Sequence, residues 1–429
     1  MKSRRWPVVA LFCSVALVFA APTRGDWPRF RGSRSNGICT ETGLIQGIPQ
    51  DGLPLLWQRK GCGTGYSSVS IVDGIVYTMG DRPDGSEKSQ MVIAFDLATR
   101  KELWATRVGP PHRDGPRCTP TVDDGRVYAL GTSADLVCLD AVTGHLLWKK
   151  NLQDDFGGKM MSGWRWSESP LVDGERLICT PGAKNAMLVA LNKNSGQLIW
   201  KNAMPDIGDS GKDGAGYASA TAAKIDGVRQ YITIVGRGAI GVAADTGQFL
   251  WGYNAIANGV ANISSPVVRG NHVFVTTSYK TGSALLKLTR DGDTFDVEEV
   301  YVLSPKQFEN HHGGIVLIGD FLYGGDGQNN GTPVCLNWRT GDIQWKEEKW
   351  KRKAGASGSA AVLYADGHLV FRYQKDALIA LIEATPEAFR VKGTFQAAVD
   401  DGPAWAHPVI YDGKLFLRAN DTLMCYDVR

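Results

Sequence analysis

The stretch that decides the fold is the pair of segments TPTVDDGRVYAL (residues 119–130) and LVCLDAVTGHLLW (residues 136–148). Apolar or alternating runs of about five residues, which is strand length, are separated by Asp124-Gly125 and Thr143-Gly144. Such dipeptides mark tight turns, because glycine accepts the positive φ that these turns need. The unit therefore predicts a four-stranded antiparallel meander that ends at Trp148.

The same unit recurs along the 429-residue chain. Its copies end at Trp57, Trp104, Trp148, Trp200, Trp251, Tyr301, Trp345 and Phe395. A lone meander leaves two apolar faces exposed, and radial packing around an axis buries both of them. The repeats therefore predict an all-β, eight-bladed β-propeller of four-stranded antiparallel blades. Phe and Tyr replace Trp in two copies, so we interpret these aromatic residues as packing residues between blades.

The two ends of the repeat region are complementary halves. Trp57, in LLWQ, has no preceding strands of its own, whereas the unit that begins at Pro408-Val409 stops after Leu423–Asp427. We therefore expect the N-terminal strand around Trp57 to complete the last blade, which removes an open sheet edge.

The first residues predict export. Lys2, Arg4 and Arg5 precede an apolar stretch, Val8–Ala21, that is shorter than the roughly 20 residues of a membrane-spanning helix. We expect a cleaved signal peptide over residues 1–21, an N-terminal extension over 22–52 and the propeller over 53–429, in a periplasmic or secreted protein with no membrane span. The formal charge of +3 includes those three cations. The processed chain is then near neutral, which argues against nucleic-acid binding.

The cysteines divide into two groups. Cys138, Cys335 and Cys425 occupy one position of the repeat, where other copies carry alanine, and are interpreted as small buried apolar residues. In an oxidising compartment, Cys39 and Cys62 are the predicted disulfide pair.

The segments that precede the first strand of each blade converge at one mouth of a propeller channel. They carry the predicted ligand-binding residues Tyr66, Arg117, Trp164, Arg165, Trp166, Tyr217, Asn262, Trp405 and His407, and the candidate acid–base groups Glu168, His311 and His312. Aromatic walls with a few polar groups suit a small-ligand pocket, and arginine suits an anionic group. The alternative is a water-filled channel whose polar groups satisfy one another. Adjacent histidines on a strand point to opposite faces, so no metal site is predicted.

The copies of Ala-x-Asp-x-x-Thr-Gly-x-x-x-Trp type over residues 53–429 resemble the PQQ-like repeat family. This family includes the propellers of quinoprotein alcohol dehydrogenases and the outer-membrane assembly lipoprotein BamB. The resemblance to the dehydrogenases implies PQQ and Ca²⁺, with the quinone against a disulfide of adjacent cysteines. No two cysteines are adjacent here, and we find no calcium-binding Glu, Asn and Asp set.

These departures favour the non-enzymatic branch of the resemblance. We expect a monomeric binding or scaffold platform for an envelope protein or a small ligand, with PQQ and Ca²⁺ implied only by the family resemblance. The alternative is an atypical PQQ-dependent oxidoreductase that acts on alcohols or sugars.

Overall fold

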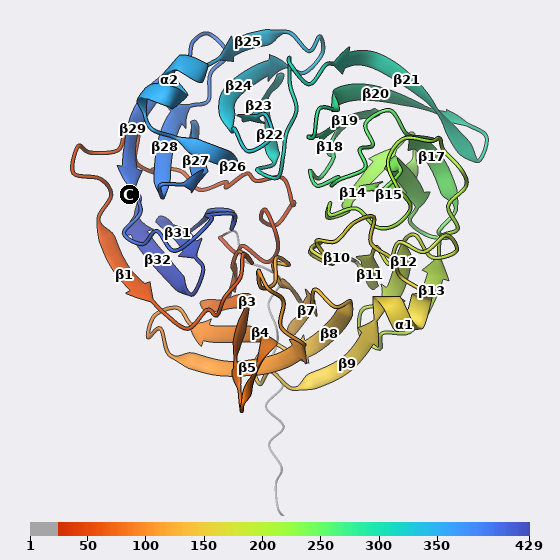
Figure 1. Ribbon diagram of the computed structural model, residues 1–429, viewed down its shortest axis with the longest axis horizontal. Helices are drawn as coiled ribbons and strands as arrows, with labels where there is room; N and C mark the ends of the chain where they lie inside the picture. The colour runs from red at the N-terminus through yellow and green to blue at the C-terminus, as the bar shows by residue number, and fades with distance from the viewer. Residues whose placement is uncertain (1–24) are drawn as a thin grey trace, which may run out of the picture.

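The computed structural model describes residues 25–429, and the predicted signal peptide lies outside them. Eight four-stranded antiparallel sheets stand radially around a central axis (Figure 1), which confirms the predicted eight-bladed propeller. Two short helices, α1 (Leu152–Phe156) and α2 (Glu348–Lys353), lie in connections between strands. No helix within residues 25–429 is long and apolar enough to cross a bilayer.

Each of the first four blades consists of consecutive strands. Blade 1 contains β2 (Ser70–Val72), β3 (Ile75–Asp84), β4 (Glu87–Asp96) and β5 (Glu102–Gly109); blade 2 contains β6 (Thr121–Asp123), β7 (Arg126–Leu130), β8 (Asp135–Asp140) and β9 (Leu146–Asn151). Blade 3 contains β10 (Leu171–Asp173), β11 (Arg176–Cys179), β12 (Val189–Asn192) and β13 (Leu198–Lys201); blade 4 contains β14 (Thr221–Ile225), β15 (Val228–Val235), β16 (Gly238–Ala243) and β17 (Phe249–Tyr253).

The other four blades follow the same plan, except that the last takes its outer strand from the N-terminal side. Blade 5 contains β18 (Val267–Arg269), β19 (His272–Thr277), β20 (Gly282–Asp291) and β21 (Thr294–Leu303); blade 6 contains β22 (Ile315–Ile318), β23 (Phe321–Asp326), β24 (Thr332–Asn337) and β25 (Ile343–Lys346). Blade 7 contains β26 (Ser357–Ala365), β27 (His368–Lys375), β28 (Leu378–Glu383) and β29 (Val391–Gln396); blade 8 contains β30 (Val409–Tyr411), β31 (Lys414–Ala419), β32 (Thr422–Asp427) and β1 (Leu55–Arg59).

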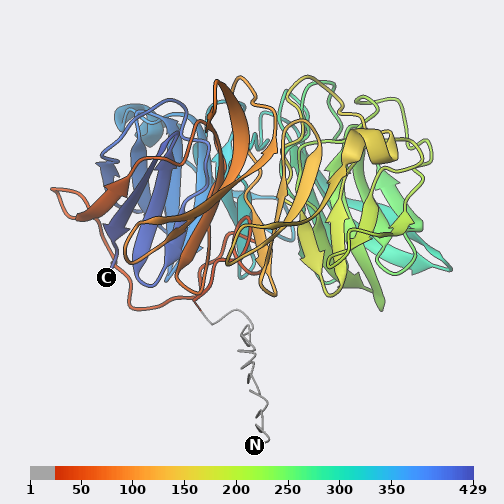
Figure 2. The same cartoon turned by 90° about the horizontal axis from the view of Figure 1, so that it is seen from below.

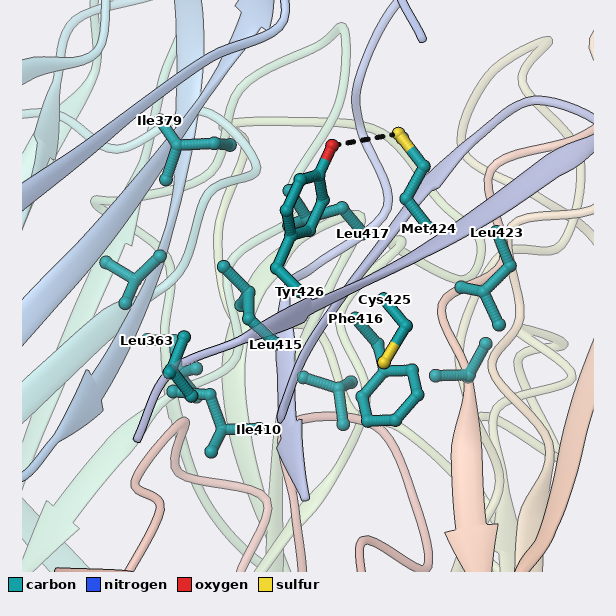
Figure 3. Close-up of a cluster of buried hydrophobic side chains, with 14 of the residues drawn as sticks. Leu363, Ile379, Ile410, Leu415, Phe416, Leu417, Leu423, Met424, Cys425 and Tyr426 are labelled. Atoms are coloured by element: carbon teal, nitrogen blue, oxygen red, sulfur yellow. Dashed lines mark hydrogen bonds between the residues drawn. The ribbon is translucent and has the colours of Figure 1, made fainter. Parts of the chain in front are cut away.

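The closure predicted for blade 8 is confirmed. Strand β1 pairs antiparallel with β32, and Trp57 lies opposite Cys425. The core between blades 7 and 8 packs Leu363 and Ile379 against Leu415 and other apolar residues of blade 8 (Figure 3). Cys425 is fully buried in this core, as its position in the repeat predicts.

The repeated aromatic residues join neighbouring blades. Trp104 Nε1 donates a hydrogen bond to the Ala141 carbonyl of blade 2 (3.1 Å), and Trp148 Nε1 donates to the Lys193 carbonyl of blade 3 (2.9 Å). A Cβ on Gly144, in the Thr-Gly turn of blade 2, would overlap the Trp104 ring. The ring of one blade therefore packs on the glycine of the next, which confirms the packing interpretation and explains why the two motifs recur together.

A Ser or Thr at the same position of successive repeats, followed by Pro in blades 2 and 3, also connects blades around the channel. The Ser68 N–H donates to Thr119 Oγ1 (3.1 Å), the Thr119 N–H donates to Ser169 Oγ (3.0 Å), and the Ser169 N–H donates to Ser219 Oγ (2.9 Å). Each hydroxyl accepts the bond from the blade before it. These buried bonds satisfy backbone donors at the inner ends of blades 1 to 3 and hold the blades in register.

The predicted disulfide between Cys39 and Cys62 is wrong, because both cysteines are free and buried. They belong to different parts of the ring. The Cys39 N–H donates to the Tyr364 carbonyl of blade 7 (2.8 Å), whereas the Cys62 carbonyl accepts a bond from Arg418 of blade 8 (3.1 Å). Burial raises the pKa of the Cys39 thiol to about 11, so this thiol stays protonated.

The segment 25–52 contacts the ring at several points along its length. Trp27 pairs with Ile71 of blade 1, and Ile38 pairs with Tyr364 of blade 7. Further on, the Ile45 N–H donates to the Val428 carbonyl (2.8 Å). Figure 2 shows this segment, in red, rising into the ring from the lower face and then running outward beneath it to β1. The segment therefore enters the central channel before it closes blade 8.

Candidate functional site

A cavity of about 400 Å³ lies in the central channel, lined by residues from the inner ends of several blades and from the N-terminal segment. Its aromatic walls are Phe30, Tyr66, Trp164, Tyr217, Tyr279 and Trp405. Three imidazoles and two guanidinium groups also line it, from His311, His312, His407, Arg31 and Arg117. No carboxylate is among the lining residues, so its only formal charges are positive.

Most of the predicted site residues meet in this cavity. The structure brings together Tyr66, Arg117, Trp164, Tyr217, His311, His312, Trp405 and His407. They come from segments far apart in sequence, and the ring closure places those segments side by side. The Tyr66 and Trp405 ring centroids are 4.5 Å apart, across the junction of blades 1 and 8.

Four predicted residues do not line the cavity. Arg165 is exposed and Trp166 is buried, although their neighbour Trp164 lines the cavity. Arg165 has a positive φ of 67°, so the chain turns here and the three neighbouring side chains do not share one face. Asn262 is buried and donates through its amide to the Val235 carbonyl (2.9 Å), so it fastens the loop that carries Ile263 and Ser264 to blade 4.

Glu168 is the fourth of these residues, and it lies between blades 2 and 3. Its side chain is 4% exposed, and its oxygens accept bonds from the Thr180 N–H (2.6 Å) and the Thr180 hydroxyl (2.8 Å). Desolvation raises the pKa of this carboxyl to about 7, although the Thr180 bonds lower it. The geometry gives Glu168 no access to the cavity and indicates a structural carboxyl.

The expectation that His311 and His312 point to opposite faces is wrong. Both rings line the cavity, with centroids 4.4 Å apart. The reason is local: β22 begins at Ile315, so the pair lies in an irregular segment without strand alternation. His311 Nδ1 is 2.9 Å from Ser359 Oγ, and its Nε2 is 3.0 Å from the Tyr279 hydroxyl.

The three imidazoles are neutral at pH 7. Burial lowers the pKa of His311 to about 4 and that of His407 to about 3, and it also lowers the pKa of His312. Neutral imidazoles offer one donor and one acceptor each. They therefore add no charge to the site, and both nitrogens of His311 are already bonded to Ser359 and Tyr279.

Tyr279 belongs to the site, and the sequence reasoning missed it. It forms with Lys280 the turn between β19 and β20, and both residues have positive φ, 62° and 66°. Such a conformation costs a non-glycine residue about 1–2 kcal/mol, and Asn-Gly is the usual sequence for this turn. The connection between β19 and β20 has four residues, 278–281, with Tyr279 and Lys280 at its centre. No repeated motif marks Tyr279 in the sequence.

Phe30 and Arg31 were missed as well, because residues 22–52 were treated as an extension without a site. They form the floor of the cavity, beneath the imidazoles. The Phe30 and His407 ring centroids lie 4.9 Å apart in an edge-on arrangement. Arg31 is 4% exposed, whereas Trp164 on another part of the lining is 41% exposed. We call the Phe30–Arg31 end of the cavity its floor and the Trp164 end its mouth.

Comparison with known proteins identifies the family. The model of the family described as outer membrane protein assembly factor BamB matches residues 88–347, more than half of the chain, so the chain belongs to this family of PQQ-like propellers. The quinoprotein alcohol dehydrogenase PedH of Pseudomonas putida is 25% identical over 57% of this chain and 41% of its own length. The outer membrane protein assembly factor BamB of Xanthomonas campestris is 29% identical over 27% of this chain and 28% of its own length.

The chain thus matches less than half the length of these curated relatives. Among solved structures, BamB from Moraxella catarrhalis superposes with a TM-score of 0.62 at 12% identity, covering 87% of this chain and 99% of that one. At this identity the likeness concerns the fold alone.

The residues of the cavity do not fit a calcium–quinone centre. Calcium takes six to eight oxygen ligands, with carboxylates prominent among them, and the lining contains none. Throughout residues 25–429, no group of three or more His, Cys, Asp or Glu residues is arranged to hold a metal. The aromatic side chains of the lining suit a planar molecule, but its polar side chains form no calcium site. We therefore derive no redox step from this cavity.

Proposed function

We propose that this protein is a binding protein whose central pocket takes a small planar ligand. The proposal rests on one cavity of about 400 Å³, which is lined by six aromatic side chains and by neutral imidazoles. Pockets of this size, mostly apolar with a few placed polar groups, are typical of small-molecule sites. The rings of Tyr66, Trp405 and His312 contact one another in series, which gives a flat ligand a continuous aromatic wall.

We further propose that the protein acts in the cell envelope, either on a small ligand alone or together with an envelope protein. The predicted signal peptide over residues 1–21 and the BamB family match support this placement. The quinoprotein relatives keep an oxidoreductase as the second candidate. The absence of carboxylates from the lining weighs against that candidate.

The test is calorimetric titration of the full chain with two planar probes of nearly equal shape, 2-naphthoate and neutral 2-naphthamide. At least one probe is expected to bind. Trp405→Leu should weaken that binding about tenfold through loss of the aromatic contact. Trp350→Leu is the matched control, because Trp350 is a partly buried tryptophan on α2, outside the cavity.

Binding of neither probe would refute the proposed pocket, and equal loss in both tryptophan variants would do the same. Titration with PQQ, with and without calcium chloride, followed by dye-linked oxidation of ethanol or glucose, tests the second candidate. Calcium-dependent turnover would replace the binding function by the enzymatic one.

A further inference from the structure

Arg31 is a buried cation at the floor of the pocket. Arg31 is 4% exposed and lines the cavity. Its Nη2 donates to the carbonyls of Asn36 (3.1 Å) and Ile315. Within the described part of the chain, no carboxylate forms an ion pair with it. Burial lowers the pKa of Arg31 to about 10, so the guanidinium is still charged at pH 7.

Two glycines make room for this guanidinium. A Cβ on Gly37 would lie 2.7 Å from Arg31 Nη2, and a Cβ on Gly314 would overlap Nη1. Gly314 comes just before β22 in blade 6, whereas Gly37 belongs to the same N-terminal segment as Arg31. The segment and the ring therefore form a slot shaped for the guanidinium.

The bonding of Arg31 differs from that of the buried arginine Arg418, which serves only structure. Arg418 uses all three of its nitrogens, on acceptors that include the carbonyls of Asn420 (2.8 Å), Ser67 (3.0 Å) and Gly63 (2.9 Å). Arg31 Nε, in contrast, has no hydrogen-bond partner among residues 25–429. A buried donor without a partner is costly, and a buried charge without a counter-charge is more so.

The rest of the lining leaves this charge uncompensated. Arg117, near the mouth, forms an ion pair with Asp114 (3.0 Å) and donates to the Trp164 carbonyl (3.1 Å). The imidazoles are neutral, and no acid lines the pocket. Two further buried ring nitrogens of lining residues, His312 Nε2 and Trp405 Nε1, also have no partner in the described chain.

We propose that the pocket selects a planar aromatic carboxylate that enters with its carboxylate first and pairs with Arg31 at the floor. A carboxylate brings the counter-charge that the guanidinium lacks, while the ring of the ligand lies among the aromatic walls. This inference rests on the proposed function, because it assigns the charge and orientation of the ligand in the same pocket.

The test compares the two naphthalene probes in the full chain. Wild type is expected to bind 2-naphthoate about tenfold or more tightly than 2-naphthamide, since hydrogen bonds to charged groups are the strong ones. Arg31→Gln should remove this preference while 2-naphthamide still binds. Arg31→Lys keeps the charge without the planar fork and should retain part of the preference.

Arg29→Lys is the matched control. Arg29 lies two residues earlier in the same segment and donates to the Val172 carbonyl (3.0 Å), outside this cavity. This variant should keep the wild-type preference, and circular dichroism checks the fold of each variant. If wild type binds both probes equally, or if the preference survives Arg31→Gln, the carboxylate assignment is overturned and the planar pocket stands. If neither probe binds, the proposed function itself fails.

Discussion

Replacing Glu168 with glutamine should stabilise the protein above neutral pH and leave its stability almost unchanged near pH 4.5. The buried carboxyl has its pKa raised from 4.5 to about 7, chiefly by desolvation. The native protein therefore keeps a proton that the unfolded chain releases as the pH rises above 4.5. The free energy of unfolding falls over this interval, until the carboxyl ionises in the native state near pH 7.

The size of the effect follows from the same two values. At about 1.4 kcal/mol per pH unit, the difference between 4.5 and about 7 costs the wild type about 3 kcal/mol at pH 8. Glutamine is neutral at every pH. Its amide can keep both bonds to Thr180, accepting from the N–H and donating to the hydroxyl oxygen.

Urea unfolding at half-unit steps from pH 5 to 8, followed by circular dichroism, measures the effect. The difference between Glu168→Gln and wild type should grow with pH toward about 3 kcal/mol in favour of the variant. Glu387→Gln, at an exposed site, controls for the amide substitution itself. Parallel curves for wild type and Glu168→Gln would refute the reasoning, as would a variant that loses stability with rising pH.

Three further outcomes are expected, each checked by urea unfolding and the third also by probe titration. Gly144→Ala should cost about 2–4 kcal/mol, well above Gly74→Ala, because both glycines have φ near 70° (71° and 72°) but only the first contacts a ring, that of Trp104; equal costs would contradict the blade-packing role. Thr119→Val should cost about 1–3 kcal/mol by leaving a buried N–H unbonded, and Thr119→Ser should restore most of it; no difference between the two would contradict the hydroxyl's role. Tyr279→Asn should stabilise the turn by about 1 kcal/mol and weaken probe binding; unchanged binding would remove Tyr279 from the pocket.

The propeller could be predicted from the sequence because its determinants are local and repeated. Asp124-Gly125 specifies a hairpin wherever it stands between two strands, and Trp148 recurs at the same position of the unit. Even the closure by Trp57 followed from counting strands. One copy of the turn and Trp motifs would be weak evidence for a blade. Because the motifs recur along the chain, together they made the propeller fold predictable.

The pocket was predictable in part. Loops before the first strands converge in every propeller, which placed Tyr66 and Trp405 together although they are far apart in sequence. The fine alternation of side chains around Trp164 was not predictable, because it depends on irregular backbone such as the positive φ of Arg165 (67°). Phe30 and Arg31 were missed because no repeat marks a segment that folds back into the channel.

The path of residues 25–59 has a consequence for the order in which the molecule is assembled. Phe30 and Arg31 complete the pocket, and β1 completes blade 8 by pairing with β32. Strand β1 can pair with β32 only after residues 422–427 have been synthesised, and Phe30 must wait for His407. Contacts of such long sequence separation form late and slowly. The binding site is therefore completed late, together with the pairing of β1 and β32 that closes the propeller. A chain in which this closure has not formed lacks the complete pocket. A ligand bound beside Arg31 should in turn stabilise the closed propeller by mass action.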